Sequence, residues 1–186
     1  MVSLAQLWLP ILLAALACHF VGFLVWVVLP HHKSDYSPLP DEAAARNLFK
    51  GKLSPGQYIM PWSAQKDWNN PEVVAKRNEG PNAFMVVLPN GMGNMPAQMV
   101  KNVLFHALVS LFVAYIGIHA LAPGADYLKV FQVTGTAAFM AYGFTWGHQV
   151  IWFGRPLKVG MKDMLDGLVM ALMTAGMFGW RWPGAM

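Results

Sequence analysis

The sequence predicts an all-α membrane protein: a four-transmembrane-helix bundle with a cytoplasmic insert of about 70 residues between helices 1 and 2. Of the 186 residues, 56% are hydrophobic and 12% are charged, about half the charged share of a soluble domain. Four apolar segments, 4–29, 103–121, 128–153 and 159–182, are each long enough to cross a hydrocarbon core of ~30 Å. Because the charges gather between the first two segments, residues 1–186 are expected to form a single membrane domain.

The first apolar segment is predicted to be a retained span rather than a cleaved signal peptide. Residues 1–6 carry no charged side chain, whereas a signal peptide begins with a basic region. The apolar run continues through Val28, well past the length of about 7–15 residues that is usual for a signal peptide. The one cysteine, Cys18, lies inside this segment, so a disulfide framework is excluded.

The positive charges near the segment ends predict the orientation of the chain. Eight Lys and Arg residues lie between the first two segments, and Arg155, Lys158 and Lys162 lie near the turn between the last two. The opposite side has only Lys129 and Arg181. The long loop is therefore predicted to be cytoplasmic, with both termini periplasmic or exterior.

The net charge of +4 is modest and suits an anionic lipid surface better than a nucleic acid. The predicted partners are therefore the lipid bilayer and either other membrane-protein subunits or further copies of this chain. No nucleic-acid partner is expected.

The insert, residues 30–102, contains signals for short elements. Asn70, Pro71 and Glu72 supply an N-cap, a proline for the first helical position and an acid in the first turn, so a helix is predicted there that stops before Gly80. Residues 41–49 predict a second short helix, and residues 83–88 a strand or extended segment.

Several large apolar side chains lie among polar neighbours in the insert, which is unusual for a disordered linker. They are Tyr58, Ile59, Met60, Trp62 and Trp68. Two interpretations remain open: the loop folds back as a cap on the helices, or these side chains form part of a partner-binding surface.

Small residues at four-residue spacing predict close helix contacts, because membrane helices associate through tight packing. The fourth segment has the longest stripe, and the third and first have shorter ones. The stripes are Gly167, Ala171, Ala175 and Gly179; Gly143 and Gly147; and Ala14, Cys18 and Gly22.

Ionisable residues of the apolar segments collect near one predicted membrane face. At 1.5 Å per residue, four of them lie within about 10 Å of the cytoplasmic boundary, and the two histidines that end the first segment lie nearby. The four are His106, His148, Asp163 and Asp166, and the two are His31 and His32. The aspartates are expected to compensate a helix dipole and to pair with neighbouring basic side chains. A polar cluster of His31, His32, Asp163 and Asp166 is therefore predicted at this face.

His106 and His148 suggest a second possibility. A b-type haem needs two axial histidines that face each other at matched depth, and these two meet the depth condition. They are therefore the candidate cofactor ligands, for haem or another redox cofactor. The competing interpretation is that each is an interfacial or hydrogen-bonded histidine.

No signature of a known enzyme class appears in the sequence: there is no HExxH, GxSxG, P-loop or dinucleotide fingerprint. No catalytic residue and no metal site are predicted. The leading interpretation is a non-enzymatic accessory or scaffold subunit of a membrane complex, without a cofactor. A redox-cofactor protein, or a small-solute or lipid-binding membrane protein, remains the alternative.

Six short runs along the chain resemble those of an uncharacterised family of bacterial proteins. They are residues 30–36 (PHHKSDY), 39–42 (LPDE), 55–58 (PGQY), 151–156 (IWFGRP), 162–166 (KDMLD) and 178–183 (FGWRWP). The family consists of four-span bacterial inner-membrane proteins of unknown function. The resemblance covers most of the chain and implies a multi-pass protein of the bacterial inner (plasma) membrane, without implying an activity.

Overall fold

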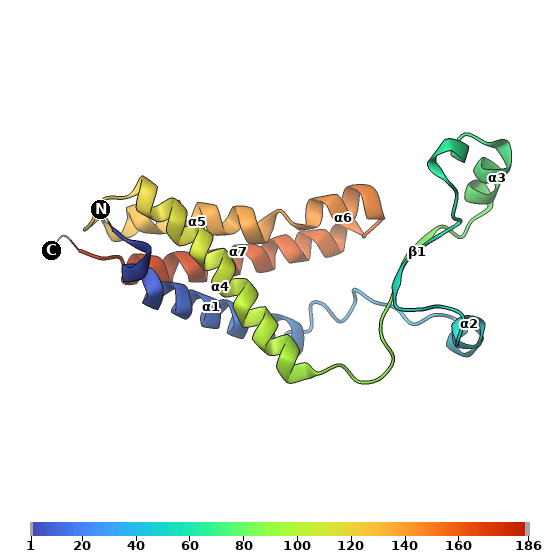
Figure 1. The fold of residues 1–186 in the computed structure, drawn as a ribbon, viewed down its shortest axis with the longest axis horizontal. Helices are drawn as coiled ribbons and strands as arrows, with labels where there is room; N and C mark the ends of the chain where they lie inside the picture. Colours follow the sequence, from blue (N-terminus) through green and yellow to red (C-terminus); the bar gives the residue numbers. More distant parts are fainter. Residues whose placement is uncertain (1, 185–186) are drawn as a thin grey trace. The chain divides into compact units, whose positions relative to one another are not determined.

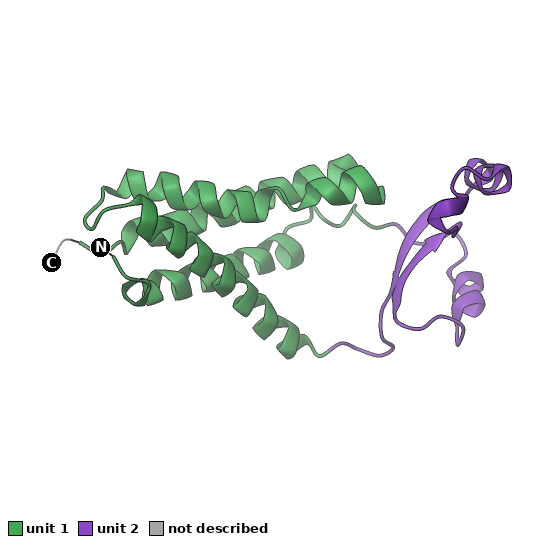
Figure 2. Ribbon diagram, turned by 45° about the horizontal axis from the view of Figure 1, so that its top comes forward, with its two compact units in different colours: residues 1–36, 94–186 green, residues 37–93 purple. Residues whose placement is uncertain are grey.

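The computed structural model describes residues 2–184. Helices account for 66% of the chain, which confirms the predicted helical class. The chain divides into two compact units, one of residues 1–36 and 94–186 and the other of residues 37–93 (Figures 1 and 2).

The first unit consists of long helices that pack against one another. The most extensive contact is between α5 and α7, and α1 contacts both α4 and α7. The helices are α1 (Trp8–Phe23), α4 (Met95–Ala120), α5 (Tyr127–Gly143), α6 (Trp146–Phe153) and α7 (Leu157–Trp180). A 3-10 turn, η1 (Leu4–Leu7), precedes α1, and a π-helical segment, η2 (Leu24–Val28), follows it.

Two stretches among residues 2–184, Leu4–Val28 and Met95–Ala120, are long and apolar enough to cross a membrane. A core helix of a soluble protein is mostly buried, whereas only 28% of the most apolar window of each stretch is buried here. The second stretch begins eight residues before the predicted 103, because the side chain of Asn94 accepts a hydrogen bond from the Ala97 N–H and caps the helix.

The third and fourth predicted spans do not pass the same test, so the structure does not support four equivalent apolar spans. Segment 128–153 is not one helix: α5 ends at Gly143 after 17 residues, and α6 begins at Trp146. Segment 159–182 lies on one helix, α7, as far as Trp180, but four charged residues in the first ten positions of that helix lower its hydropathy. They are Lys158, Lys162, Asp163 and Asp166.

The described ends of the chain lie at the same end of the helical unit (Figure 1). The C-terminal segment is tied to the turn between α4 and α5, where the Trp182 indole N–H donates to the Ala122 carbonyl at 3.0 Å and the Gly124 N–H donates to the Pro183 carbonyl at 2.8 Å. At the opposite end, the loop that follows η2 lies on the start of α7. The helices therefore run back and forth along the unit.

The interior of this unit combines apolar side chains, among them Leu7, Val113 and Phe178, with small and polar ones. Ala14, Cys18, Ser110, Thr134 and Thr174 are all fully buried. Each threonine hydroxyl donates to the carbonyl four residues earlier, which satisfies it inside the helix.

The predicted small-residue contacts are present between α5 and α7. A Cβ atom at Gly167 would lie 2.7 Å from the backbone carbonyl of Tyr142, and one at Gly135 would lie 3.1 Å from the Ala175 side chain. A Cβ atom at Gly179 would lie 2.7 Å from the ring of Tyr127. The stripe on the fourth segment is therefore confirmed as a packing face.

The second unit contains short elements around a two-stranded antiparallel sheet. The predicted helices are confirmed as α2 (Glu42–Phe49), capped by Asp41, and α3 (Pro71–Glu79), capped by Asn70. The predicted strand is β2 (Ala83–Val87), which pairs with β1 (Gly56–Met60) in the register Tyr58 to Met85. A 3-10 turn, η3 (Gln65–Asp67), lies between β1 and α3.

Candidate functional site

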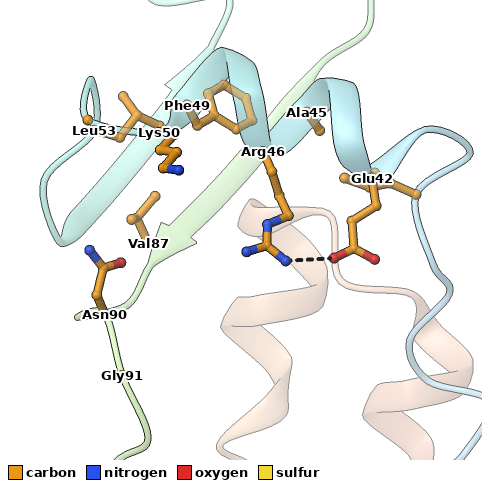
Figure 3. Close-up of a pocket in the computed structure, with 11 residues that line it drawn as sticks. Glu42, Ala45, Arg46, Phe49, Lys50, Leu53, Val87, Asn90 and Gly91 are labelled. Carbon is orange, nitrogen blue, oxygen red and sulfur yellow. Dashed lines mark ion pairs between the residues drawn. The ribbon is translucent and has the colours of Figure 1, made fainter.

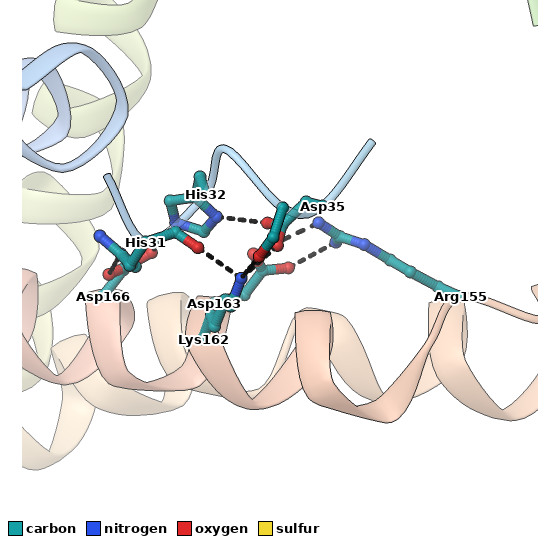
Figure 4. Close-up of polar contacts among 8 residues, drawn as sticks. His31, His32, Asp35, Arg155, Lys162, Asp163 and Asp166 are labelled. Atoms are coloured by element: carbon teal, nitrogen blue, oxygen red, sulfur yellow. Dashed lines mark hydrogen bonds and ion pairs between the residues drawn. The ribbon is translucent and has the colours of Figure 1, made fainter. Parts of the chain in front are cut away.

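A cluster of polar side chains joins the loop after η2 to α7 (Figure 4). His31 Nε2 lies 3.1 Å from Asp166 Oδ1, and His32 Nε2 lies 2.7 Å from Asp166 Oδ2. The other ring nitrogen of His32, Nδ1, lies 2.5 Å from Asp35 Oδ2. The Asp166 carboxylate therefore contacts two adjacent imidazoles, one with each oxygen. We call His31, His32, Asp35, Lys162 and Asp166 the loop–α7 cluster.

Lys162 completes the cluster from the helix side. Its Nζ donates to the Asp35 carboxylate, to the backbone carbonyl of His31 and, at 3.1 Å, to Ser34 Oγ. Lys162 and Asp166 are four residues apart on α7 and so lie on the same helix face. One helix face thus supplies both a cation and an anion, which hold the loop at several points.

The centre of the cluster is shielded from solvent. The side chains of His32 and Asp35 are 3% and 2% exposed. The indole of Trp26, on η2, stacks on the His32 ring with a centroid distance of 4.0 Å and an interplanar angle of 3°. The His31 side chain, in contrast, is 34% exposed, so the cluster is open on that side.

The surroundings shift the pKa values of the two buried loop residues in opposite directions. Burial alone would lower the pKa of His32, but the hydrogen bonds and negative charges of Asp35 and Asp166 outweigh it and raise that pKa. The hydrogen bonds from Lys162 and His32 lower the pKa of Asp35. Both shifts favour an ion pair between His32 and Asp35.

Asp163 belongs to a separate pair. Arg155, in the turn between α6 and α7, forms an ion pair with Asp163 and donates a second hydrogen bond to it at 3.3 Å. Gly154, with φ of 69°, ends α6 in a left-handed conformation and begins this turn. The predicted polar group of His31, His32, Asp163 and Asp166 is thus divided, with the two histidines on Asp166 and the arginine on Asp163.

His106 and His148 have different surroundings. His106 is buried on α4, and its Nδ1 lies 3.1 Å from the hydroxyl of Tyr142 on α5. His148 lies exposed on α6. His106 lines a pocket between α1 and α4, and His148 is not among the residues that line it. The haem ligation by His106 and His148 stays a prediction.

The pocket between α1 and α4 has a volume of about 690 Å³ and a mostly apolar lining. Its polar groups come from both helices, with His19 Nδ1 2.8 Å from Asn102 Oδ1. The lining residues are His19, Gly22, Phe23, Trp26, Val27, Met95, Gln98, Met99, Lys101, Asn102, Phe105, His106, Tyr142 and Met170.

A further pocket, of about 590 Å³, lies within the second unit beside α2 and the end of β2 (Figure 3). Glu42 and Arg46, one turn apart on α2, form an ion pair at 3.8 Å along its edge. Both side chains are mostly exposed, so this pair contributes little binding energy.

Sequence reasoning missed three members of the main site. Asp35 lies three residues after His32, a spacing that could have indicated a local hydrogen bond, and Trp26 lies six residues before His32. Lys162 was expected only to neutralise neighbouring acids on its own helix. The contact between residues 31–35 and α7 spans about 130 positions in the chain, and local pattern carries no signal for it.

No family model, curated protein or solved structure matches this chain. The resemblance to four-span inner-membrane proteins therefore stays a prediction.

Proposed function

We propose that this chain is a small integral membrane protein of the bacterial inner membrane, with four crossing helices and no enzymatic activity. It would serve as an accessory subunit that binds another membrane protein through its second unit. The proposal has two parts, the membrane crossing and the partner, and each has its own support.

The distribution of side chains supports four crossings. Large apolar side chains are exposed on every long helix of the first unit, although the unit also has an apolar interior, so its outer surface suits contact with lipid. Examples are Leu12, Leu16 and Phe20 on α1; Leu104, Leu108 and Phe112 on α4; Leu128 and Met140 on α5; Ile151 and Trp152 on α6; and Leu165, Leu168 and Leu172 on α7.

The charges of α7 are compatible with a crossing. Lys162 and Asp166 are bonded within the loop–α7 cluster, and Asp163 is paired with Arg155, so these charges are neutralised within the protein. All of them lie in the first three turns, at the end of the helix that would meet the membrane boundary. Between α5 and α6, Phe144 and Thr145 keep right-handed helical dihedrals, so the two helices together can act as one interrupted span.

The observation that carries the accessory role is the exposure of the second unit. None of residues 37–93, all of which the structure describes, is buried. One face of its two-stranded sheet displays Ile59, Phe84 and Val86, which are 40%, 55% and 68% exposed, and Trp62 beyond β1 is 74% exposed. A unit of this size needs to bury apolar surface to be stable, so a partner surface is the expected cover.

Purification from native membranes tests this role. The full chain is isolated in mild detergent, and its mass and composition are compared with those of a double variant, Ile59→Ser with Val86→Ser. A stoichiometric membrane-protein partner that is retained by the wild type and lost from the variant supports the proposal. Met92→Ser is the matched control, because Met92 is fully exposed but lies outside the sheet. Recovery of the wild type as a lone monomer would overturn the accessory role.

The pocket between α1 and α4 favours a second candidate function, the binding of a lipid or other amphiphile. Its apolar walls suit an acyl or isoprenoid chain, while Lys101, Asn102 and His19 at its polar side suit an anionic or carbonyl headgroup. Mass spectrometry of the native protein would detect a retained amphiphile. Its loss in a Gly22→Phe variant, which fills the pocket beside Met170, would link the ligand to this pocket.

A further inference from the structure

We propose that His31, His32 and Asp166 bind a transition-metal ion of the Zn²⁺ class. This is a site beyond the accessory role, and the sequence alone did not predict it. The proposal rests on four features of the loop–α7 cluster. They are the spacing of its donor atoms, the chemical nature of those donors, the residues that support His32 and the partial exposure of His31.

The spacing of the donor atoms is close to what a metal ion needs. One donor atom from each of the three residues can be chosen so that all lie within 4.8 Å of one another. Tetrahedral coordination with bonds of about 2.0–2.1 Å places neighbouring donors about 3.3–3.4 Å apart. His31 Nε2 lies 3.1 Å from Oδ1 of Asp166, and His32 Nε2 lies 2.7 Å from its Oδ2, so each imidazole contacts a different oxygen of the same carboxylate. The two imidazoles and the carboxylate would shift so that one donor atom from each surrounds the ion.

The chemistry of the donors narrows the class of ion. Two imidazole nitrogens and one carboxylate oxygen suit Zn²⁺ and its first-row neighbours, whereas Mg²⁺ and Ca²⁺ prefer oxygen ligands throughout. Three protein ligands leave a fourth position for water or another small ligand. The partly exposed side of His31 gives access to that position.

The residues that hydrogen-bond to and pack on His32 are of the kind that support a metal ligand. A ligating histidine commonly donates its second ring N–H to a carboxylate, which fixes its tautomer and orientation. Asp35 accepts at Nδ1 of His32 in this way and leaves Nε2 directed at Asp166. Lys162 donates to Asp35 and so holds its carboxylate in place. Trp26 stacks on the His32 ring and so fixes the plane of the imidazole.

Binding would have a structural consequence. Two ligands lie in the loop that leaves the first helical segment, and the third lies on α7. The ion would therefore join the first and last helices of the first unit at the end where the chain leaves for the second unit. Without an ion, the same side chains hydrogen-bond directly between histidine and aspartate.

Direct metal titration tests the proposal. The full chain is purified in detergent, stripped with a chelator and titrated with Zn²⁺ by calorimetry and with Co²⁺ by visible absorption. One ion per chain and a tetrahedral Co²⁺ spectrum are expected. Affinity should fall at least 100-fold in His32→Gln and Asp166→Asn, and about 10–100-fold in Asp35→Asn, which removes only the supporting carboxylate.

His119→Gln is the matched control, since His119 is exposed on α4 near its far end, and it should leave the affinity unchanged. If Asp166→Asn does not fold, His31→Gln replaces it, because the His31 side chain is partly exposed. Lack of saturable binding by the wild type, or equal binding by wild type and the His31 or His32 variant, would overturn the proposal and leave the cluster as ion pairs alone.

Discussion

Gly167 on α7 lies directly against the backbone of Tyr142 on α5, at a distance that leaves no room for a side chain. A Cβ atom at Gly167 would lie 2.7 Å from both the carbonyl carbon and the carbonyl oxygen of Tyr142. Backbone atoms cannot swing aside as a flexible side chain can. This contact therefore sets how closely the two most extensively packed helices approach.

Substitution of Gly167 should consequently separate α5 from α7. Gly167→Ala is expected to cost about 1–3 kcal/mol of unfolding free energy through overpacking, and Gly167→Leu more. Gly147→Ala is the control, because nothing lies within 4 Å of that position and alanine favours the helix by about 0.5–1 kcal/mol. Denaturant titration in detergent micelles measures both. Equal stability of the two alanine variants would contradict this packing.

Tyr142 also supplies the polar partner of a buried histidine. Tyr142→Phe removes the hydroxyl that lies 3.1 Å from His106 Nδ1 and leaves that nitrogen without this partner. A loss of about 1–3 kcal/mol is expected, because an unsatisfied buried polar group is costly. Tyr115→Phe, at an exposed position on α4, should change stability by less than about 0.5 kcal/mol. The same micelle titration compares the two, and similar losses would argue against the importance of the His106 contact.

Lys162 should control how firmly the loop after η2 is held. Lys162→Met removes the donor to Asp35, Ser34 and the His31 carbonyl, so local opening of the loop should become more frequent. Trypsin cleavage after the exposed Lys33 should then increase several-fold. Lys158→Met, at an exposed position on the same helix, should leave this cleavage unchanged. Mass spectrometry of the peptide ends measures the rate, and an unchanged rate in Lys162→Met would mean that other contacts hold the loop.

The features that could be predicted from the sequence are those with local causes. The helices that begin after Asp41 and Asn70 follow from side-chain caps within a few residues, and the packing face around Gly167 follows from a four-residue spacing. The start of α4 was missed because apolarity rises only after residue 103, although Asn94 carries the cap.

The remaining features depend on contacts between distant parts of the chain. Strand β1 forms because Gly56–Met60 pairs with Ala83–Val87, and the sequence close to β1 contains no signal that predicts this partner. The sequence predicts that His31 and His32 lie at the same level as Asp166, but this predicted depth does not decide which acid they contact. Depth also made His106 and His148 look alike, whereas rotation about their helices directs one into the interior and leaves the other exposed.

The proposed orientation predicts which surfaces are reached from outside an intact cell. In a Cys18→Ala background, Met92→Cys should be shielded from a membrane-impermeant maleimide, because the second unit is proposed to be cytoplasmic. Lys129→Cys, at the exposed start of α5 near the chain ends, should react. After the cells are opened, both should react, since both positions are exposed. In the wild-type protein, Cys18 is fully buried against Met170 and Thr174, so it should react slowly in intact and in opened cells. Labelling of residue 92 and protection of residue 129 in intact cells would show that the topology is the inverse of the proposed one. Labelling of both residues in intact cells would exclude the proposed topology.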